Sequence, residues 1–218
     1  MKKSICCWLI LLCGLAFSGP LKAESLPNPV RVAVVPFQSE SAPDRDYLRC
    51  RACGAILKSG PIEGDPTTLL TEMIWHLLLE RGKGYEFISP GQVEGVYNTL
   101  LAKGFERNTG LLMQSLGKQI KADYVLWGVV THYQERQGTP FGVQRPAAAT
   151  LDVHLLKVQE GTLVWKALWS ETQKPLSENL FEMGAFLKRK ARWVTVEELS
   201  YQGLEEMLKT FPPADTLP

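Results

Sequence analysis

Residues 122–173 constrain the fold more than any other part of the chain. Residues 124–130 (YVLWGVV) are almost wholly apolar, as in a strand that is buried on both faces of a sheet. In residues 151–156 and 163–170, apolar side chains recur at every second position, which predicts two antiparallel strands with one more buried face. The pair at 160–161 (EG) between them predicts a hairpin turn. We therefore expect three consecutive strands at the centre of the fold.

The other elements have start and stop signals of their own. Residues 30–37 (VRVAVVPF) predict another strand buried on both faces, and residues 85–88 predict a short one. Capping residues and glycine stops predict five helices. They run from Asp65 to Gly82, from Ser89 to Gly104, from Asn108 or Thr109 to Lys121, from Ser177, and from Thr195 to about Thr210. Together these elements predict an α/β (α+β) fold, a single domain with a mixed β-sheet of about four to five strands flanked by helices.

The first 23 residues have the layout of an export signal. Lys2 and Lys3 precede an apolar run at 5–17 that is short for a bilayer span, and Ala23 is a small residue at the predicted cleavage point. We expect a signal peptide at 1–23, a linker at 24–29, one domain at 30–211 and a flexible tail at 212–218. An uncleaved anchor is one alternative. A lipid on Cys13 is another, although Leu12 is not the small residue that a lipobox needs.

Charge and the signal together indicate a compartment. Removing 1–23 leaves 21 basic and 23 acidic residues, a net charge of −2. Nucleic-acid binding, which needs a strongly basic face, is not predicted. We expect an exported protein in the periplasm, with attachment to the outer membrane or peripheral membrane association as alternatives.

Two cysteines remain in the predicted mature chain, Cys50 and Cys53, within CRACG. An even pair in an exported protein predicts a local structural disulfide. A metal site is an alternative, although two thiolates are half of a tetrahedral zinc site and no second CxxC or neighbouring histidine accompanies them in the sequence. Redox chemistry is the other alternative, although residues 47–60 are predicted as loop rather than a helix start. We expect neither a metal nor a cofactor.

No catalytic motif is present in the sequence. His76 lies on a predicted helix, and His132 and His154 lie on predicted strands, outside any nucleophile or metalloprotease pattern. We interpret all three as structural. The chain is therefore predicted not to be an enzyme, with a periplasmic thiol–disulfide protein that uses the two cysteines as the alternative.

Three groups of residues are candidates for contact with a partner. The first is the Gly/Pro-rich loop at 137–146, where an aromatic and a cation are available for contact. The second is a tryptophan pair on one strand face, for which packing under a helix is favoured and a binding surface at the sheet edge is the alternative. The third is a basic run that either complements a helix dipole or binds acidic groups. The candidates are Phe141, Arg145, Trp165, Trp169, Lys188, Arg189, Lys190 and Arg192.

Three motifs in this order resemble a known superfamily: VAVVPF at 32–37, ADYVLWGVV at 122–130 and EGTLVW at 160–165. They are similar to motifs of the TolB N-terminal domain, the curli-secretion lipoproteins and the outer-membrane lipoprotein activators of penicillin-binding proteins. The resemblance implies a mixed sheet flanked by helices, no active site, and a role in envelope assembly, secretion or regulation by protein contact. A subunit of an outer-membrane secretion pore is the alternative. The CRACG insert and the sequence RKARWVTVEEL are outside the shared pattern.

Overall fold

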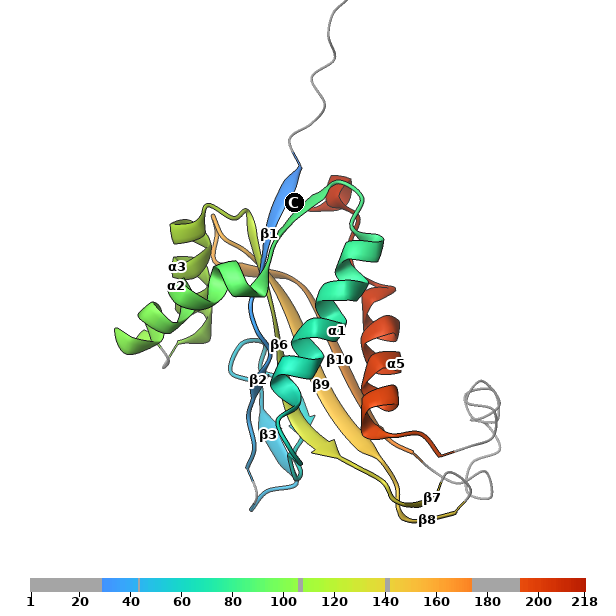
Figure 1. Cartoon of the computed structure of the whole chain (residues 1–218). Helices are drawn as coiled ribbons and strands as arrows, with labels where there is room; N and C mark the ends of the chain where they lie inside the picture. The colour runs from blue at the N-terminus through green and yellow to red at the C-terminus, as the bar shows by residue number, and fades with distance from the viewer. Residues whose placement is uncertain (1–28, 43, 106–107, 140–141, 174–192) are drawn as a thin grey trace, which may run out of the picture.

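The computed structural model describes residues 29–42, 44–105, 108–139, 142–173 and 193–218. The predicted signal peptide, the predicted helix from Ser177, Phe141 and the basic run at 188–192 lie outside the described residues. The predicted α/β class is confirmed, since one mixed sheet carries helices on both of its faces (Figure 1).

Five strands lie side by side in the order β10 (Thr162–Thr172), β9 (Ala148–Lys157), β6 (Tyr124–Gln134), β1 (Val30–Val34) and β5 (Tyr85–Ile88). Strand β1 is parallel to both of its neighbours, whereas β9 is antiparallel to both β6 and β10. The short β2 (Gln38–Ser39) pairs with β6 beyond the end of β1, so the sheet has six strands. The long strands β6, β9 and β10 confirm the predicted central stretch.

Sequence patterns explain these strands. In β6 and β9 every residue except the last is buried, because both strands have a covered sheet face on each side. Strand β10 is at the edge of the sheet and alternates between more and less exposed positions. The predicted turn before it is confirmed: Gly161 has a φ of 70°, a left-handed conformation that glycine adopts without steric cost.

The described helices begin at the predicted caps. They are α1 (Pro66–Arg81), α2 (Pro90–Ala102), α3 (Thr109–Ile120) and α5 (Val196–Leu208). Asp65 accepts from the Thr67 amide, and Asn108, rather than Thr109, caps α3 by accepting from the Leu111 amide. None of the helices in the described residues combines the length and hydrophobicity that crossing a membrane requires.

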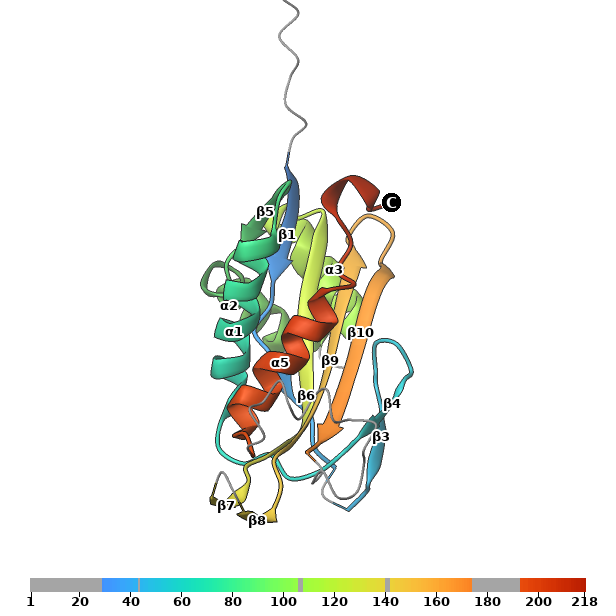
Figure 2. The same ribbon diagram turned by 90° about the vertical axis from the view of Figure 1, so that its right-hand side faces the viewer.

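The helices form a layer on each face of the sheet. Helices α1 and α5 cover one face, over a core that includes Leu126 and Leu151 (Figure 2). Helices α2 and α3 cover the other face, where Leu116 and Val125 belong to a second core. Gly117 brings α3 against the sheet, because a Cβ at that position would overlap the side chain of Val158.

Helices α2 and α3 cover only part of their face, and residues 38–64 cover the rest. This segment was predicted to be a loop, but it contains an antiparallel hairpin of β3 (Tyr47–Arg49) and β4 (Ile56–Lys58). The inward residue Leu57 is 1% exposed, and the Lys58 carbonyl accepts from Thr131 Oγ1 of β6 at 2.7 Å. The hairpin escaped prediction because each strand has three residues and two of every three face solvent.

Residues 212–218, predicted as a flexible tail, contact the sheet. They include a short 3-10 helix, Ala214–Thr216. The Tyr85 hydroxyl donates to the Pro212 carbonyl at 2.7 Å, and the Tyr124 hydroxyl donates to the Pro218 carbonyl at 2.5 Å. The C-terminus therefore lies at the same end of the molecule as the start of β1 (Figure 1).

Candidate metal centre and hairpin surface

Four side chains that can bind a metal ion meet between the β3–β4 hairpin and strand β9. Cys50 and Cys53 come from the turn of the hairpin, and Asp152 and His154 come from β9. One ligand atom from each residue lies within 4.8 Å of the ligand atoms of the other three. Cysteine, histidine and carboxylate ligands are the set that zinc uses in proteins.

The hairpin turn places both cysteines. The Cys50 amide donates to the Ala55 carbonyl at 2.8 Å, and the Gly54 amide donates to the Cys50 carbonyl at 3.0 Å. Gly54 has a φ of 74°, so glycine is the residue that suits this position. The amides of Ala52 and Cys53 both lie 3.4 Å from Cys50 Sγ. The turn thus surrounds one sulfur with backbone donors.

Strand geometry places the other two side chains. Asp152 and His154 are two residues apart, so both point to the sheet face that the hairpin covers. Asp152 is 1% exposed and His154 is 0% exposed. The ring of Trp127, opposite His154 on β6, stacks on the imidazole with the centroids 4.9 Å apart. The imidazole is therefore held between a tryptophan and the cysteine turn.

Contacts within the cluster are close. His154 Nε2 lies 3.1 Å from Asp152 Oδ2 and 3.4 Å from Cys50 Sγ. Cys53 Sγ lies 3.8 Å from Asp152 Oδ2. The second ring nitrogen of His154, Nδ1, is buried and has no hydrogen-bond partner among the described residues. The nitrogen that faces the cluster is therefore Nε2.

Cys50 and Cys53 are free thiols in the structure, so the predicted disulfide is not formed there. Burial raises the pKa of the Cys50 thiol to about 12, and the neighbouring Asp152 acts in the same direction. Without a metal, Cys50 is therefore a protonated thiol at neutral pH. A thiol–disulfide enzyme needs an accessible cysteine with a lowered pKa, so the redox alternative gains no support here.

Sequence reasoning missed Asp152 and His154 as partners of the cysteines. The prediction against a metal depended on the absence of a histidine near the CxxC, but His154 reaches Cys50 across 104 positions of sequence. One signal was available: the two residues are spaced by two on a predicted strand, so both project from one face. It did not say that the cysteine segment lies over that face.

The outer face of the hairpin carries Tyr47, Arg49, Ile56 and Lys58, which we call the hairpin surface. Tyr47 is 60% exposed and Ile56 is 57% exposed, and Arg49 and Lys58 are exposed beside them. The register pairs Tyr47 with Lys58 and Arg49 with Ile56, so all four side chains share one face. No sequence signal singled out this surface, because the segment was predicted to be a loop.

The predicted tryptophan pair packs under α5. A Cβ at Gly203 would lie 2.6 Å from the Trp169 ring, so the helix rests on that side chain. Trp165 Nε1 donates to Thr210 Oγ1 at 3.2 Å, and its ring meets Phe211 edge to face. These contacts support packing rather than partner binding for the pair, even though β10 is an edge strand.

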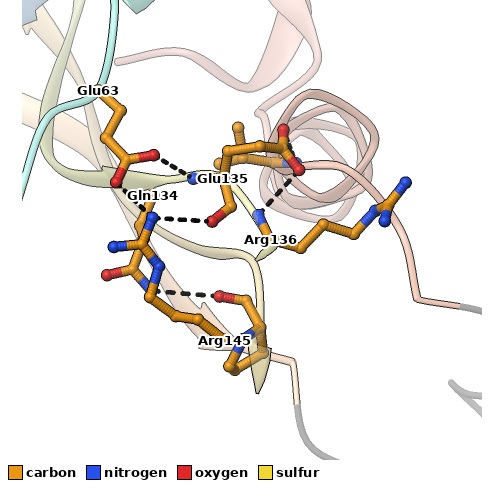
Figure 3. Close-up of polar contacts among 7 residues, drawn as sticks. Glu63, Gln134, Glu135, Arg136 and Arg145 are labelled. Atoms are coloured by element: carbon orange, nitrogen blue, oxygen red, sulfur yellow. Dashed lines mark hydrogen bonds and ion pairs between the residues drawn. The ribbon is translucent and has the colours of Figure 1, made fainter. Parts of the chain in front are cut away.

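Arg145 is the last residue of β8 (Gly142–Arg145). Its side chain lies in a polar network that joins Glu63 to the end of β6 (Figure 3). Its Nη2 donates to Glu63 Oε1 at 2.7 Å, and the second Glu63 oxygen accepts from the Glu135 amide at 3.0 Å. The Glu135 carboxylate accepts from the amide of Val196 at the start of α5. Arg145 thus joins the end of the 38–64 segment to the sheet, with its side chain 35% exposed.

Comparisons with known proteins gave no family and no curated relative: no family model and no curated protein matches the sequence. The chain is similar to solved structures of low sequence identity. PelC in a dodecamer from Paraburkholderia phytofirmans is 14% identical, with a TM-score of 0.45 over 84% of this chain and 89% of PelC. Lipoprotein GNA1162 from Neisseria meningitidis is 16% identical, with a TM-score of 0.42 over 75% of this chain and 99% of that protein. The C-terminal domain of LpoB from Escherichia coli is 18% identical, with a TM-score of 0.40 over 70% of this chain and 90% of the domain.

Proposed function

We propose that the protein is a non-catalytic, exported cell-envelope protein that binds another protein through the hairpin surface. The observation that carries this proposal is the pairing of two large exposed apolar side chains, Tyr47 and Ile56, with two cations on one short hairpin. Exposed apolar residues that gather on one element mark contact sites more often than scattered ones do. The other large apolar residues that are exposed in the described chain lie singly on α1, α3, β10 and α5: Leu79, Leu111, Leu168 and Tyr201.

The residue types fit a protein interface. Tyrosine and arginine are enriched among the residues that contribute most to binding, because each combines a large contact area with hydrogen bonding. The hairpin is also attached to the sheet. Leu57 on its inner face is buried, and the long Lys58 side chain reaches β10, where its Nζ donates to Thr172 Oγ1 at 3.0 Å. Tyr47 and Ile56 are therefore presented on an element that is fixed to the sheet.

Charge indicates the chemistry of the partner. A hollow of about 530 Å³ beside the hairpin is lined by Arg45, Arg49 and Arg51, with Glu40 as its acidic residue. Glu40 lies 3.8 Å from Arg51, and Arg45 and Arg49 are further exposed cations of the same lining. A partner segment that carries acidic side chains next to apolar ones would match this surface. The export-signal pattern of residues 1–23 supports an envelope location for that partner.

Site-specific photocrosslinking in intact cells tests the proposal. A photoreactive amino acid at position 47 or 56 is expected to give a defined protein adduct, whereas the same amino acid at Leu111, which is 53% exposed on α3, should give none. Arg49→Glu should reduce the adduct about tenfold, because it reverses the charge that faces an acidic partner. Lys103→Glu, at the exposed end of α2, is the matched charge control.

Two outcomes would contradict the proposal. Equal adducts from positions 47 and 111 would show that contact is not specific to the hairpin surface. Adducts that contain lipid or polysaccharide and no protein would exclude a protein partner. Hydrogen exchange over residues 47–58 of Arg49→Glu, measured in parallel, shows whether the variant keeps the hairpin.

A further inference from the structure

We propose that Cys50, Cys53, Asp152 and His154 together bind one zinc ion, which fastens the β3–β4 hairpin to the central sheet. This inference goes beyond partner binding and does not depend on it. It rests on the positions of four ligand atoms within 4.8 Å of one another, in residues from two elements that are about a hundred positions apart.

The distances fit the edges of a tetrahedron. Zinc–sulfur bonds of about 2.3 Å and zinc–nitrogen or zinc–oxygen bonds of about 2.0–2.2 Å, at tetrahedral angles, place a sulfur about 3.6 Å from a nitrogen or oxygen ligand and a nitrogen about 3.4 Å from an oxygen ligand. The structure has 3.4 Å between Cys50 Sγ and His154 Nε2, and 3.8 Å between Cys53 Sγ and Asp152 Oδ2. His154 Nε2 lies 3.1 Å from Asp152 Oδ2. The cluster therefore needs only small side-chain adjustments to surround an ion.

The cysteine turn is suited to hold a thiolate. Two backbone amides, of Ala52 and Cys53, point at Cys50 Sγ from 3.4 Å, and N–H donors stabilise the negative charge of a metal-bound sulfur. Gly54 closes the turn in a left-handed conformation, and the Arg49 guanidinium lies next to it. A cation beside the turn offsets the excess negative charge of two thiolates and a carboxylate around a divalent ion.

Burial gives a second, independent indication of a ligand. Asp152 is 1% exposed, and its side-chain partners in the described residues are the other members of the cluster, which are two thiols and an imidazole. A buried carboxylate is costly unless a positive charge accompanies it. A divalent cation at the centre would supply that charge and give each of the four ligand atoms a bond.

The ligand set selects zinc over the common hard cations. Magnesium and calcium are bound by oxygen ligands, whereas two sulfurs, one imidazole and one carboxylate in tetrahedral array suit zinc. Four protein ligands leave no open position for a substrate, and Cys50, Asp152 and His154 are buried. The site is therefore structural: the ion holds the hairpin, and with it the hairpin surface, in place on β9.

Metal content of the full chain, recovered under reducing conditions without a chelator, is the first test. About one zinc per chain is expected, with near-complete loss in Cys53→Ser and Asp152→Asn. His76→Ala is the matched control, because His76 is exposed on α1 and should leave the zinc content unchanged. Cys53→Ser is conservative and changes a half-buried residue, so we expect it to fold.

Cobalt substitution of the unmodified chain tests the site without any variant. Cobalt should give the intense visible absorption of a tetrahedral site together with a sulfur-to-metal charge-transfer band. Removal of the metal with a chelator should increase hydrogen exchange of residues 47–58 by at least about tenfold and leave residues 109–120 unchanged. The comparison of hydrogen exchange between these two segments shows whether the ion stabilises the hairpin rather than the whole fold.

Three results would overturn the proposal: a chain that neither contains zinc nor gives the cobalt bands, a Cys53→Ser variant with undiminished zinc, or a Cys50–Cys53 disulfide found by peptide mapping of the isolated protein. A site without zinc but with specific crosslinks from position 47 would refute the metal and leave partner binding intact. About one zinc per chain, without specific crosslinks from position 47, would refute partner binding and leave the metal site intact.

Discussion

The sheet face under α2 and α3 is covered in two different ways. In one half, apolar side chains such as Leu100 of α2 and Leu116 of α3 form one buried core with Val125 of β6. In the other half, the β3–β4 hairpin covers Asp152 and His154, both of which are buried. One strand pair therefore supports an apolar core at one end and a polar cluster at the other.

The difference lies in what each half needs to be stable. Apolar burial is non-directional and contributes about 25 cal/mol per Å² of apolar surface, whatever the detailed geometry. A buried polar group instead needs a specific partner and costs free energy without one. The helix-covered half should therefore be indifferent to chelators and mild acid, whereas the hairpin-covered half should respond to both.

The largest effect is expected in the helix-covered half. Leu116 is fully buried, so Leu116→Ala should lower the free energy of unfolding by about 2–5 kcal/mol through lost burial and a residual cavity. Urea titration followed by circular dichroism measures this, and the loss should be the same with and without a zinc chelator. A loss that depends on the chelator would remove the distinction between the two halves.

A smaller effect is expected on acidification. Burial lowers the pKa of His132, with the Lys58 cation acting in the same direction and Gln134 and Glu63 opposing it. The folded chain then binds fewer protons than the unfolded chain, whose histidine titrates near pH 6.5. The contribution of His132 is therefore complete above that pH, and stability falls as the pH decreases below it.

Urea titrations at about pH 7.5 and about pH 5 measure the acid effect, since this interval spans the ordinary pKa of histidine. The free energy of unfolding should fall less between these pH values in His132→Gln than in the unmodified chain. His76→Gln, at an exposed position on α1, should show the full decrease. Hydrogen exchange should place the acid-sensitive region next to Gly60, whose backbone lies against the His132 ring. An unchanged pH dependence in His132→Gln would assign the effect to other groups.

The smallest effect is expected for Arg145→Ala. The Arg145–Glu63 pair joins the end of the 38–64 segment to β8, but both side chains are 35% exposed, so solvent screens the pair. Loss of the pair should cost less than about 1 kcal/mol. Lys209→Ala, which removes a surface pair with Glu206 on α5, provides the comparison. A loss of several kcal/mol in Arg145→Ala would show that the network in Figure 3 holds the segment more firmly than its exposure indicates.

Much of the helix-covered half could be predicted because its signals are local. Asn108 precedes an apolar periodicity of helical spacing, and Ser89 with Gln92 forms the capping box that starts α2. The apolar run of β6 indicated a strand buried on both faces. Each of these signals needs only neighbours in sequence, and the structure confirms each element.

The hairpin-covered half could not be predicted in the same way. Its strands are three residues long and face solvent at most positions, so they have little periodicity. The contact between Cys50 and His154 joins residues 104 positions apart, and no local pattern encodes that distance. Asp152 and His154 were assigned to the less buried face of a strand, because the cover over that face was not recognised.

The chain enters the sheet at Val30 and ends at Pro218 at one pole of the molecule, whereas the β3–β4 hairpin lies toward the opposite pole (Figure 1). Strand β6 runs between the poles for 11 residues, or roughly 36 Å at about 3.3 Å per residue. Lys58, which pairs with Tyr47, bonds Thr131, seven positions after the start of β6, so anything attached ahead of Val30 is separated from Tyr47 by roughly 23 Å of that strand.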